Sequence, residues 1–384
     1  MTTTVPASKD LRSALDAVLD GVVRSNAQAV DRDGVFPEEN IAALGAAGLL
    51  GLTADAAVGG GGQGMRAAAE VVERLAGVCG STAMVSLMHY AAAAAIEAYG
   101  PEDVRREIGE GRHLSTLAFS ESGSRSHFWA PVGTATAAGD SVRLDARKSW
   151  VTSAGRADSY VWSSLPMAGN GPMTLWLVRN GSDGLTVAGD FDGLGLRGNM
   201  SRPMTADGLT VPADAELGAD GAGLDIALTV PLPWFLVLNA AFCLGLADAA
   251  VTEVARHLTV TTLTHTGKAL RDAPVPRRDF ARLSVRVHAL RTFLGDALTA
   301  LETGREDATL RVLQVKALAG DMVAEVTDEA MRLCGGSAFR KELGLERMFR
   351  DARAARVMAP TSDALHDFVG RVSTGLPLLD EENR

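Results

Sequence analysis

Residues 148–154 read Lys148-Ser149-Trp150-Val151-Thr152-Ser153-Ala154, and they continue a run from Val142 in which apolar and charged residues alternate. This alternation is typical of a β-strand with one side in water. Positions 150 and 152 have the same parity, so a strand would place the Trp150 ring and the Thr152 hydroxyl on one side. An aromatic face beside such a hydroxyl suits a flat cofactor, and an ordinary strand with a buried tryptophan is the alternative.

A polar loop upstream of this strand offers a second candidate ligand contact. It reads Ser120-Glu121-Ser122-Gly123-Ser124-Arg125-Ser126 and directly follows an apolar stretch. Turns rich in hydroxyl groups and glycine present backbone N–H groups that can bind an anion or a heterocycle. Taken alone, the same residues are compatible with a plain loop.

Two stretches near the C-terminus follow a helix predicted over residues 310–333. Gly335 and Gly336 are expected to cap that helix. Residues 346–353 read Glu-Arg-Met-Phe-Arg-Asp-Ala-Arg. By spacing alone, this charged stretch is typical of a solvated helix end.

The chain divides into three regions by the period of its apolar residues. Residues 1–115 are predicted to form successive helices, and residues 116–222 a small β domain with turns between short strands. Residues 223–384 return to helices. This order predicts an α+β fold with a helical domain at each end.

The composition excludes several classes of protein. The 384 residues are too many for one ordinary core. A formal net charge of −10 argues against a nucleic-acid-binding protein. Three widely separated cysteines, without a C-x-x-C pair, argue against a disulfide scaffold and a cysteine zinc site. The N-terminus has no visible secretory signal, so a cytoplasmic protein is expected.

One apolar run requires a check against a membrane span. Residues 226–247 form 22 positions without a charge, close to the length of a transmembrane helix. Pro231 and Pro233 interrupt the first part of the run. A buried central helix that begins near Pro233 is therefore predicted, with no membrane contact.

The histidines and glycines give no strong motif. None of the seven histidines forms an H-x-x-x-H or H-E-x-x-H pair, so no metal site is predicted. His89 lies in an alanine-rich helix, where a structural role is expected and a role near an active site is the alternative. Gly59–Gly64 contains G-x-G-x-x-G, but no strand precedes it, so it is predicted to be a surface loop.

Taken together and in order, these stretches resemble the signature motifs of the acyl-CoA dehydrogenase superfamily over essentially the whole chain. The loop at 120–126 resembles its T-E-P-x-x-G-S-D flavin loop, and residues 148–154 resemble its K-x-W-I-T-N-A strand. The remaining matches are Gly195–Gly198 with G-x-R, Val211-Pro212 and Leu217-Gly218 with V-P-x-x-x-L-L-G, Gly335-Gly336 with G-G-x-G-Y, and Arg350–Arg353 with R-D-A-R.

The resemblance implies a C-terminal four-helix bundle beside the N-terminal helical domain and the central β domain. FAD, or alternatively FMN, would lie where the three meet. Trp150 would pack on the isoalloxazine ring, and Thr152 would hydrogen-bond near flavin N5. The other implied cofactor contacts are Phe119, Ser120, Ser126, Arg332, Gly335, Gly336 and Thr361. Because family members are commonly tetramers, a homo-oligomer, either tetramer or dimer, is expected.

Departures from the family pattern affect the catalytic base and the grip on the cofactor. The glutamate of the Y-E-G-T stretch is replaced by Ala359, and the alternative glutamate position in the first bundle helix aligns with Phe235. Loss of a general base typically costs about 10²–10⁴-fold in rate. Leu263 replaces the arginine of the R-x-x-F-G motif, which grips the flavin pyrophosphate from a neighbouring subunit. Arg332 replaces the glutamine before Gly-Gly, and His127 replaces the aspartate that closes the flavin loop.

The favoured hypothesis is an oxygenase-like enzyme that uses reduced flavin and O₂ on an apolar or aromatic small molecule. Relatives of this kind need no α-proton base, and a flavin reductase supplies them. Two alternatives stay open: an acyl-thioester dehydrogenase with an unrecognised base such as Asp363, and a non-catalytic subunit. Whether coenzyme A is part of the substrate also stays open. The candidate catalytic residues are Ser120 and Thr152 as hydrogen-bond donors, and His89 and His127 as groups that orient or deprotonate the substrate.

Overall fold

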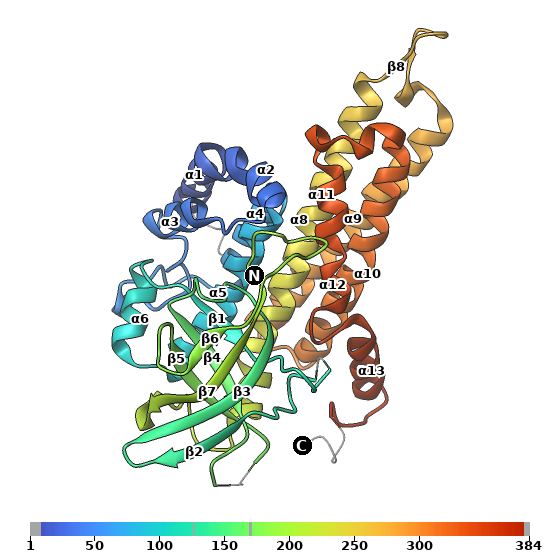
Figure 1. Ribbon diagram of the computed structural model, residues 1–384. Helices are drawn as coiled ribbons and strands as arrows, with labels where there is room; N and C mark the ends of the chain where they lie inside the picture. Colours follow the sequence, from blue (N-terminus) through green and yellow to red (C-terminus); the bar gives the residue numbers. More distant parts are fainter. Residues whose placement is uncertain (1–8, 126, 169–170, 380–384) are drawn as a thin grey trace.

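The computed structural model describes residues 9–125, 127–168 and 171–379. Its element order of helices, strands and helices confirms the predicted α+β fold class (Figure 1). The N-terminal region consists of α1 (Lys9–Val18), a π-helical turn (Leu19–Val23), α2 (Arg24–Asp33), α3 (Glu38–Ala46), α4 (Met65–Ala76), α5 (Gly80–Tyr99) and α6 (Glu102–Gly109). The glycine-rich segment Gly59–Gly64 leads into α4 as a loop with mostly exposed residues.

The middle region contains two sheets. One has the strand order β1-β4-β5, in which β1 is parallel to β4, and the other is an antiparallel sheet of order β2-β3-β7-β6. Residues 142–147 of β3 alternate between buried apolar and more exposed charged side chains, as the sequence predicts. The strands are β1 (Ser115–Ala118), β2 (Thr134–Ala138), β3 (Ser141–Val151), β4 (Ser159–Ser164), β5 (Thr174–Arg179), β6 (Leu185–Val187) and β7 (Arg202–Pro212).

The C-terminal region is built around three long helices that run side by side, with the β8–β9 hairpin at their far tip (Figure 1). Its elements are α7 (Gly223–Thr229), α8 (Pro231–Val260), β8 (Thr262–Leu263), β9 (Lys268–Ala269), α9 (Pro274–Glu302), α10 (Ala308–Cys334), α11 (Leu345–Ala352), α12 (Ala354–Val357) and α13 (Ser362–Ser373). Leu263, the residue predicted to replace the arginine of the R-x-x-F-G motif, lies in that hairpin.

The apolar run is the central helix of the protein. Helix α8 begins at Pro231, slightly earlier than predicted, because both prolines fall in its first turn, where missing N–H donors cost nothing. The segment 223–260 is long and apolar enough for a membrane span, but 67% of its most apolar window is buried inside the protein. At Gly245, an added Cβ would lie only 2.0 Å from the Glu73 carbonyl oxygen, so α8 and α4 approach closely. A core helix packed on α4, α5, α9 and α10 accounts for the composition.

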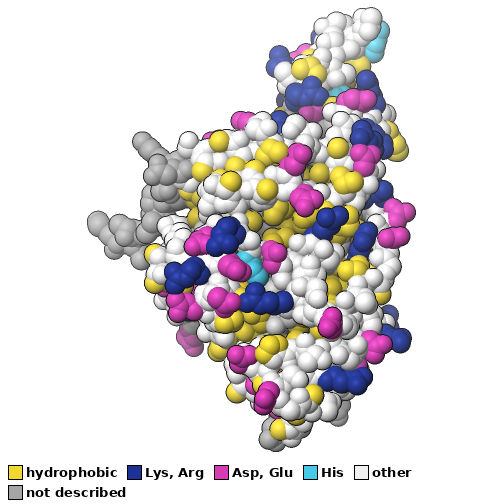
Figure 2. All heavy atoms as spheres, turned by 60° about the vertical axis from the view of Figure 1, so that its left-hand side comes forward, with side chains coloured by type: hydrophobic (Ala, Val, Ile, Leu, Met, Phe, Trp, Pro, Cys, Tyr) yellow, Lys and Arg dark blue, Asp and Glu magenta, His cyan; other side chains and the backbone are white. Residues whose placement is uncertain are grey.

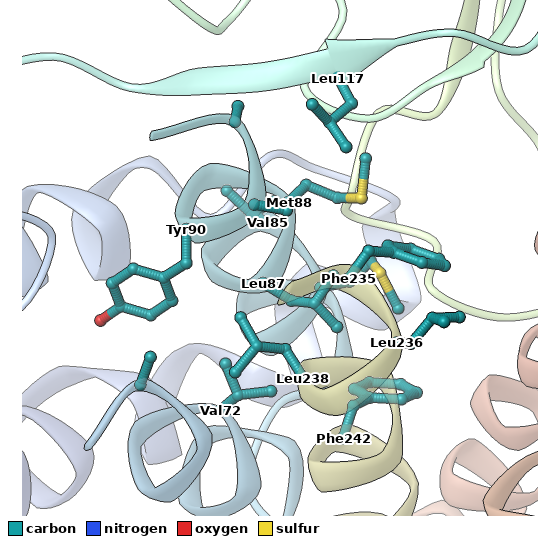
Figure 3. Close-up of a cluster of buried hydrophobic side chains, with 14 of the residues drawn as sticks. Val72, Val85, Leu87, Met88, Tyr90, Leu117, Phe235, Leu236, Leu238 and Phe242 are labelled. Carbon is teal, nitrogen blue, oxygen red and sulfur yellow. The ribbon is translucent and has the colours of Figure 1, made fainter. Parts of the chain in front are cut away.

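Helices α5 and α8 share an apolar core that extends towards the β domain. Figure 3 shows Met88 of α5, Leu117 of β1 and Phe235 of α8 gathered at one end of this core. All three are at least 90% buried. This end of the core is where the three regions of the chain meet.

The surface carries charges of both signs. On the face seen in Figure 2, Lys and Arg side chains are interspersed with Asp and Glu side chains. This mixture fits a net charge of −10 that is not concentrated in one patch of that face.

Candidate active site

A cavity of about 950 Å³ lies at the junction of the three regions. The β domain contributes residues of the loop 119–128, the end of β3 and residues of the segment 191–201. The helical regions contribute Met88, the start of α8 and residues of the segment 350–359. Cavities of this size with few polar groups typically bind small molecules or cofactors.

Four of the predicted site residues line this cavity together: Phe119, Ser120, Trp150 and Thr152. The Trp150 side chain is 70% exposed and meets Phe191 edge-to-face, with ring centroids 6.4 Å apart. Thr152 is buried, and its Oγ1 lies 3.1 Å from Oγ of Ser201, which also lines the cavity. Their mutual bond uses one of two hydroxyl hydrogens, so the other can be donated to a ligand.

The prediction that Trp150 and Thr152 lie on the same face of one strand is wrong. Strand β3 ends at Val151, its register with β7 shifts after Lys148, and Trp150 has φ +57°. A left-handed residue and a bulge break the two-residue alternation of a strand. The two side chains therefore reach one cavity because the backbone turns, not because they share a strand face.

Backbone strain is concentrated around the cavity. In the described ranges, five non-glycine residues have φ between +44° and +59°: Arg125, Trp150, Ser153, Leu196 and Met200. Arg125, Trp150 and Leu196 line the cavity. Ser153 N–H donates to Asn199 O, and Met200 O accepts from Ala154 N–H. Such residues cost about 1–3 kcal/mol each and cluster at functional sites. The cavity is therefore the best candidate for the functional site.

A buried ion pair fixes the polar loop to the β domain. Lys148 and Glu121 are each at least 96% buried, and Lys148 Nζ donates to Glu121 Oε1. Glu121 Oε2 accepts backbone N–H groups of Val132 at 2.8 Å and Gly133 at 2.7 Å. Lys148 Nζ also donates to Ser163 O at 2.7 Å. Burial lowers the pKa of Lys148 to about 8, against the opposing pull of Glu121.

No carboxylate among the described lining residues is free to take a proton from a substrate. Glu121 is the one present, and the Lys148 ammonium neutralises it. Ala359 and Phe235, the residues predicted from the motif match to occupy the two base positions, both line the cavity. Asp363 is exposed in the first turn of α13 and does not line it.

A second buried lysine holds the wall that carries residue 359. Lys316 of α10 is fully buried, and its Nζ donates to three backbone carbonyls: Ala355 at 3.0 Å, Met358 at 3.2 Å and Pro360 at 2.8 Å. Met358 and Ala359 line the cavity. Burial lowers the pKa of Lys316 to about 8. The ammonium thus fixes the path of this segment through its main chain.

His89 is not brought to the cavity, and its geometry does not support the catalytic role considered from the sequence. Its ring is fully buried, with Nε2 3.0 Å from Leu50 O and Nδ1 accepting from Ser115 N–H at 3.1 Å. The carbonyl requires Nε2 to carry the hydrogen, so both nitrogens are used. Burial lowers the pKa of His89 to about 4. It is a neutral structural histidine, and the next residue back, Met88, faces the cavity.

The lowered pKa of His89 is expected to make the stability of the folded protein depend on pH. Between pH 6.5 and 4 the unfolded chain binds a proton that the folded chain does not, so this contribution to stability is lost as the pH falls through that window. Burial raises the pKa of Asp351 to about 6, which acts with the opposite sign. The stability of the wild type relative to His89→Gln should therefore fall by about 3 kcal/mol between pH 6.5 and 4. Urea unfolding at several pH values measures this difference. Parallel pH curves for the two proteins would refute it, and His288→Gln, at an exposed position, is the control.

Other predicted residues have varied placements. Phe119 lines the cavity and stacks on Phe128, with centroids 6.5 Å apart. His127 is exposed beside Trp129 and does not line the cavity, so a catalytic role is not supported by its position. Thr361 caps α13 by accepting from Ala364 N–H at 3.3 Å, also outside the lining. Ser126 lies outside the described residues.

Arg332, Gly335 and Gly336 lie at the end of α10, away from the cavity lining. Arg332 pairs with Asp279 at 2.8 Å and Glu329 at 2.7 Å, and both glycines are exposed. Their placement does not support contact with a cofactor held in the cavity of the same chain. A contact across a subunit boundary stays a proposal.

Sequence reasoning did not identify Lys148, Glu121 or Lys316 as site-forming residues. One signal was available: only five of the 37 basic residues are lysines. Lys148 and Lys316 are two of these five, and both are buried. The rarity of lysine is a weak signal, because Lys268 and Lys341 are exposed.

The lining residues fit a flavin. The volume, the exposed Trp150 ring, the free hydroxyl hydrogen at Thr152 and Ser201, and the apolar walls together suit a flat heterocycle with polar edges. A phosphate-bearing tail would meet no lysine among the described lining residues, but Arg125 and Arg353 could each pair with an anionic group there.

Three family models match the chain: acyl-CoA dehydrogenase N-terminal domain over residues 6–110, middle domain over 116–209, and C-terminal domain over 221–374. The chain is 28% identical to cyclohex-1-ene-1-carbonyl-CoA dehydrogenase of Geobacter metallireducens, covering 95% of this chain and 98% of the relative.

Two solved structures share the fold. Butyryl-CoA dehydrogenase of Megasphaera elsdenii has a TM-score of 0.90 at 22% identity, covering 97% of this chain and all of that one. The prolyl acyl carrier protein oxidase AnaB has a TM-score of 0.87 at 17% identity, covering 96% and 99%.

Proposed function

Because the chain belongs to the acyl-CoA dehydrogenase superfamily, whose members are FAD-dependent oxidoreductases, we propose that it is an oxygenase-like member that uses reduced flavin and O₂. The single observation that carries this proposal is that the described cavity lining contains no free carboxylate: its one acid, Glu121, is paired with Lys148. Ala359 and Phe235, which the motif match assigns to the two base positions, both line this cavity. Dehydrogenation of an acyl thioester requires a base that removes a carbon-bound proton, and loss of such a base costs about 10²–10⁴-fold.

The proposed reaction inserts one oxygen atom into an apolar or aromatic substrate. A C–H bond of the substrate becomes C–OH. The second oxygen atom takes up two electrons and two protons and leaves as water. A bound reduced flavin supplies those two electrons. The residues of this chain position the reactants: Trp150 covers the ring, and the hydroxyls of Ser120, Thr152 and Ser201 offer hydrogen bonds. A flavin reductase partner follows from the proposal.

The alternative is an acyl-thioester dehydrogenase with a base outside the described lining. The 28% identity to a named acyl-CoA dehydrogenase over nearly the whole chain favours it. Asp363 would have to move from its exposed position to serve.

One experiment separates the two functions. The purified protein is loaded with oxidised FAD and mixed anaerobically with butyryl-CoA or octanoyl-CoA in a stopped-flow spectrophotometer. The oxygenase proposal expects no appreciable bleaching of the flavin, and fast bleaching would replace it with the dehydrogenase alternative.

Titration should also show that reduced FAD binds at least as tightly as oxidised FAD. Since Leu263 lacks the phosphate-pairing cation, the isolated protein is expected to contain less than one flavin per chain.

The role of Trp150 gives a further prediction. Trp150→Ala should weaken FAD binding by about 1 kcal/mol, a fivefold rise in Kd, because ring contacts of this kind have that scale. Trp150→Phe, which keeps an aromatic face, should lie between the two. Fluorescence titration with FAD gives the three constants. Equal affinities would remove Trp150 from the flavin contacts.

A further inference from the structure

The cavity contains two cations that form no ion pair with the described residues. Four described lining residues are charged: Glu121, Arg125, Arg350 and Arg353. Glu121 is paired with Lys148, and Arg350 is paired with Asp31 at 2.6 Å and Glu346 at 2.7 Å. Within the described ranges, neither Arg125 nor Arg353 has a carboxylate within ion-pair distance.

Arg353 is fixed in place by neutral groups. Its Nη2 donates to Ala324 O at 2.6 Å and Thr327 Oγ1 at 2.8 Å, and its Nε donates to Phe349 O at 3.1 Å. Its guanidinium carbon lies 4.2 Å from the centroid of the Phe349 ring. These contacts leave Nη1 without a partner among the described residues, while the guanidinium remains charged at any accessible pH.

A half-buried cation without a counter-ion is costly unless a ligand neutralises it. Arg353 is partly buried, and burial lowers its pKa more than the charge of Asp328, which lies beyond ion-pair distance, raises it. Arg125 approaches the same cavity from the β domain, on a loop whose backbone is held at φ +44°. A bulky side chain in that region of φ is unusual and is associated with functional sites.

We propose that the substrate carries an oxyanion, most simply a carboxylate, which pairs with Arg353 and is assisted by Arg125, while its apolar body occupies the rest of the cavity. The guanidinium fork matches a carboxylate in geometry, and charge-assisted hydrogen bonds are the strong ones. This inference rests on the proposed function only in assigning the cavity to the substrate. It concerns binding, so it survives or fails independently of whether oxygen or a thioester is involved.

The test compares anionic probes with neutral probes of the same shape. Benzoate against benzamide, and octanoate against octanamide, are titrated into FAD-loaded protein by calorimetry. The wild type should bind each carboxylate about tenfold or more tightly than its amide, and the ratio should fall at high salt. In Arg353→Met the ratio should drop to about one, whereas Arg353→Lys should keep part of it.

Two controls make the result decisive. Arg356→Met removes a nearby exposed arginine that pairs with Asp321 and does not line the cavity, so it should leave the ratio unchanged. If Arg353→Met does not fold, Arg125→Met, at an exposed position, should still lower the ratio.

The same variants separate a substrate anion from a cofactor phosphate. Binding of FAD and of riboflavin, which has no phosphate, is measured for each protein. If Arg353→Met weakens FAD binding but not riboflavin binding and keeps the carboxylate preference, the cation serves the cofactor and the proposal is overturned. Equal binding of acids and amides by the wild type also overturns it.

Discussion

Ala359→Glu is expected to raise the rate of anaerobic flavin reduction by a saturated acyl-CoA by about 10²–10⁴-fold, the usual contribution of a general base. The side chain at this position faces the cavity, and the wall that carries it is held by Lys316 through main-chain carbonyls. A glutamate there would place a carboxylate in a largely apolar cavity. Burial would raise the pKa of that carboxylate and make it a stronger base.

The measurement is stopped-flow bleaching of bound FAD by butyryl-CoA and octanoyl-CoA. Val357→Glu is the matched control, because it adds the same carboxylate to the same segment at a cavity-lining position that is 69% exposed. A gain confined to Ala359→Glu would mean that the missing base is what separates this chain from a dehydrogenase. No gain would mean that the cavity does not align an acyl thioester with the flavin, which favours a different substrate.

Lys148→Met is expected to lower the free energy of unfolding by about 3–5 kcal/mol, because it leaves the Glu121 carboxylate buried without its counter-ion. Glu121 would keep two backbone donors, Val132 and Gly133, but lose the ammonium that now contacts it. Ser163 would lose its donor as well. The loop 119–125 should loosen, so flavin binding should weaken together with stability.

The double variant Lys148→Met with Glu121→Gln tests the cause. It removes both charges, so a substantial part of the lost stability should return, as measured by urea unfolding of all three proteins. Arg143→Met, which breaks an exposed pair with Asp145 on the same strand, should leave stability almost unchanged. If the double variant is as unstable as the single one, lost packing of the lysine stem is the cause.

The helices and strands follow from local periodicity, which the sequence states directly. The successive helices predicted over residues 1–115 are present in the described part of that range, and Val142 to Arg147 alternate as expected. The motif identifies Trp150 and Thr152. The backbone turn that brings both side chains to the cavity depends on the left-handed conformation of Trp150, which its residue type does not predict. His89 could not be assigned from sequence because its two partners, Leu50 O and Ser115 N–H, are main-chain groups distant in the chain.

The sequence also could not predict which arginines of the cavity form ion pairs. Arg350 and Arg353 stand in one motif, yet only the first has acidic partners, and one of these, Asp31, comes from α2. Which cation is compensated depends on contacts between helices that are more than 300 residues apart. Local spacing predicted only a solvated helix end, which Arg350 contradicts because it is largely buried against the N-terminal region.

The clamp formed by Lys316 has a consequence for how this scaffold can diversify. Its ammonium recognises the carbonyl oxygens of Ala355, Met358 and Pro360, which every amino acid possesses, and it makes no demand on the side chain at position 359. A single codon change there can therefore replace an acid with an inert methyl group while the surrounding chain keeps its course. The residue at position 359 can therefore change the reaction without changing the fold. A lineage can lose one chemistry and acquire another without first passing through an unfolded ancestor.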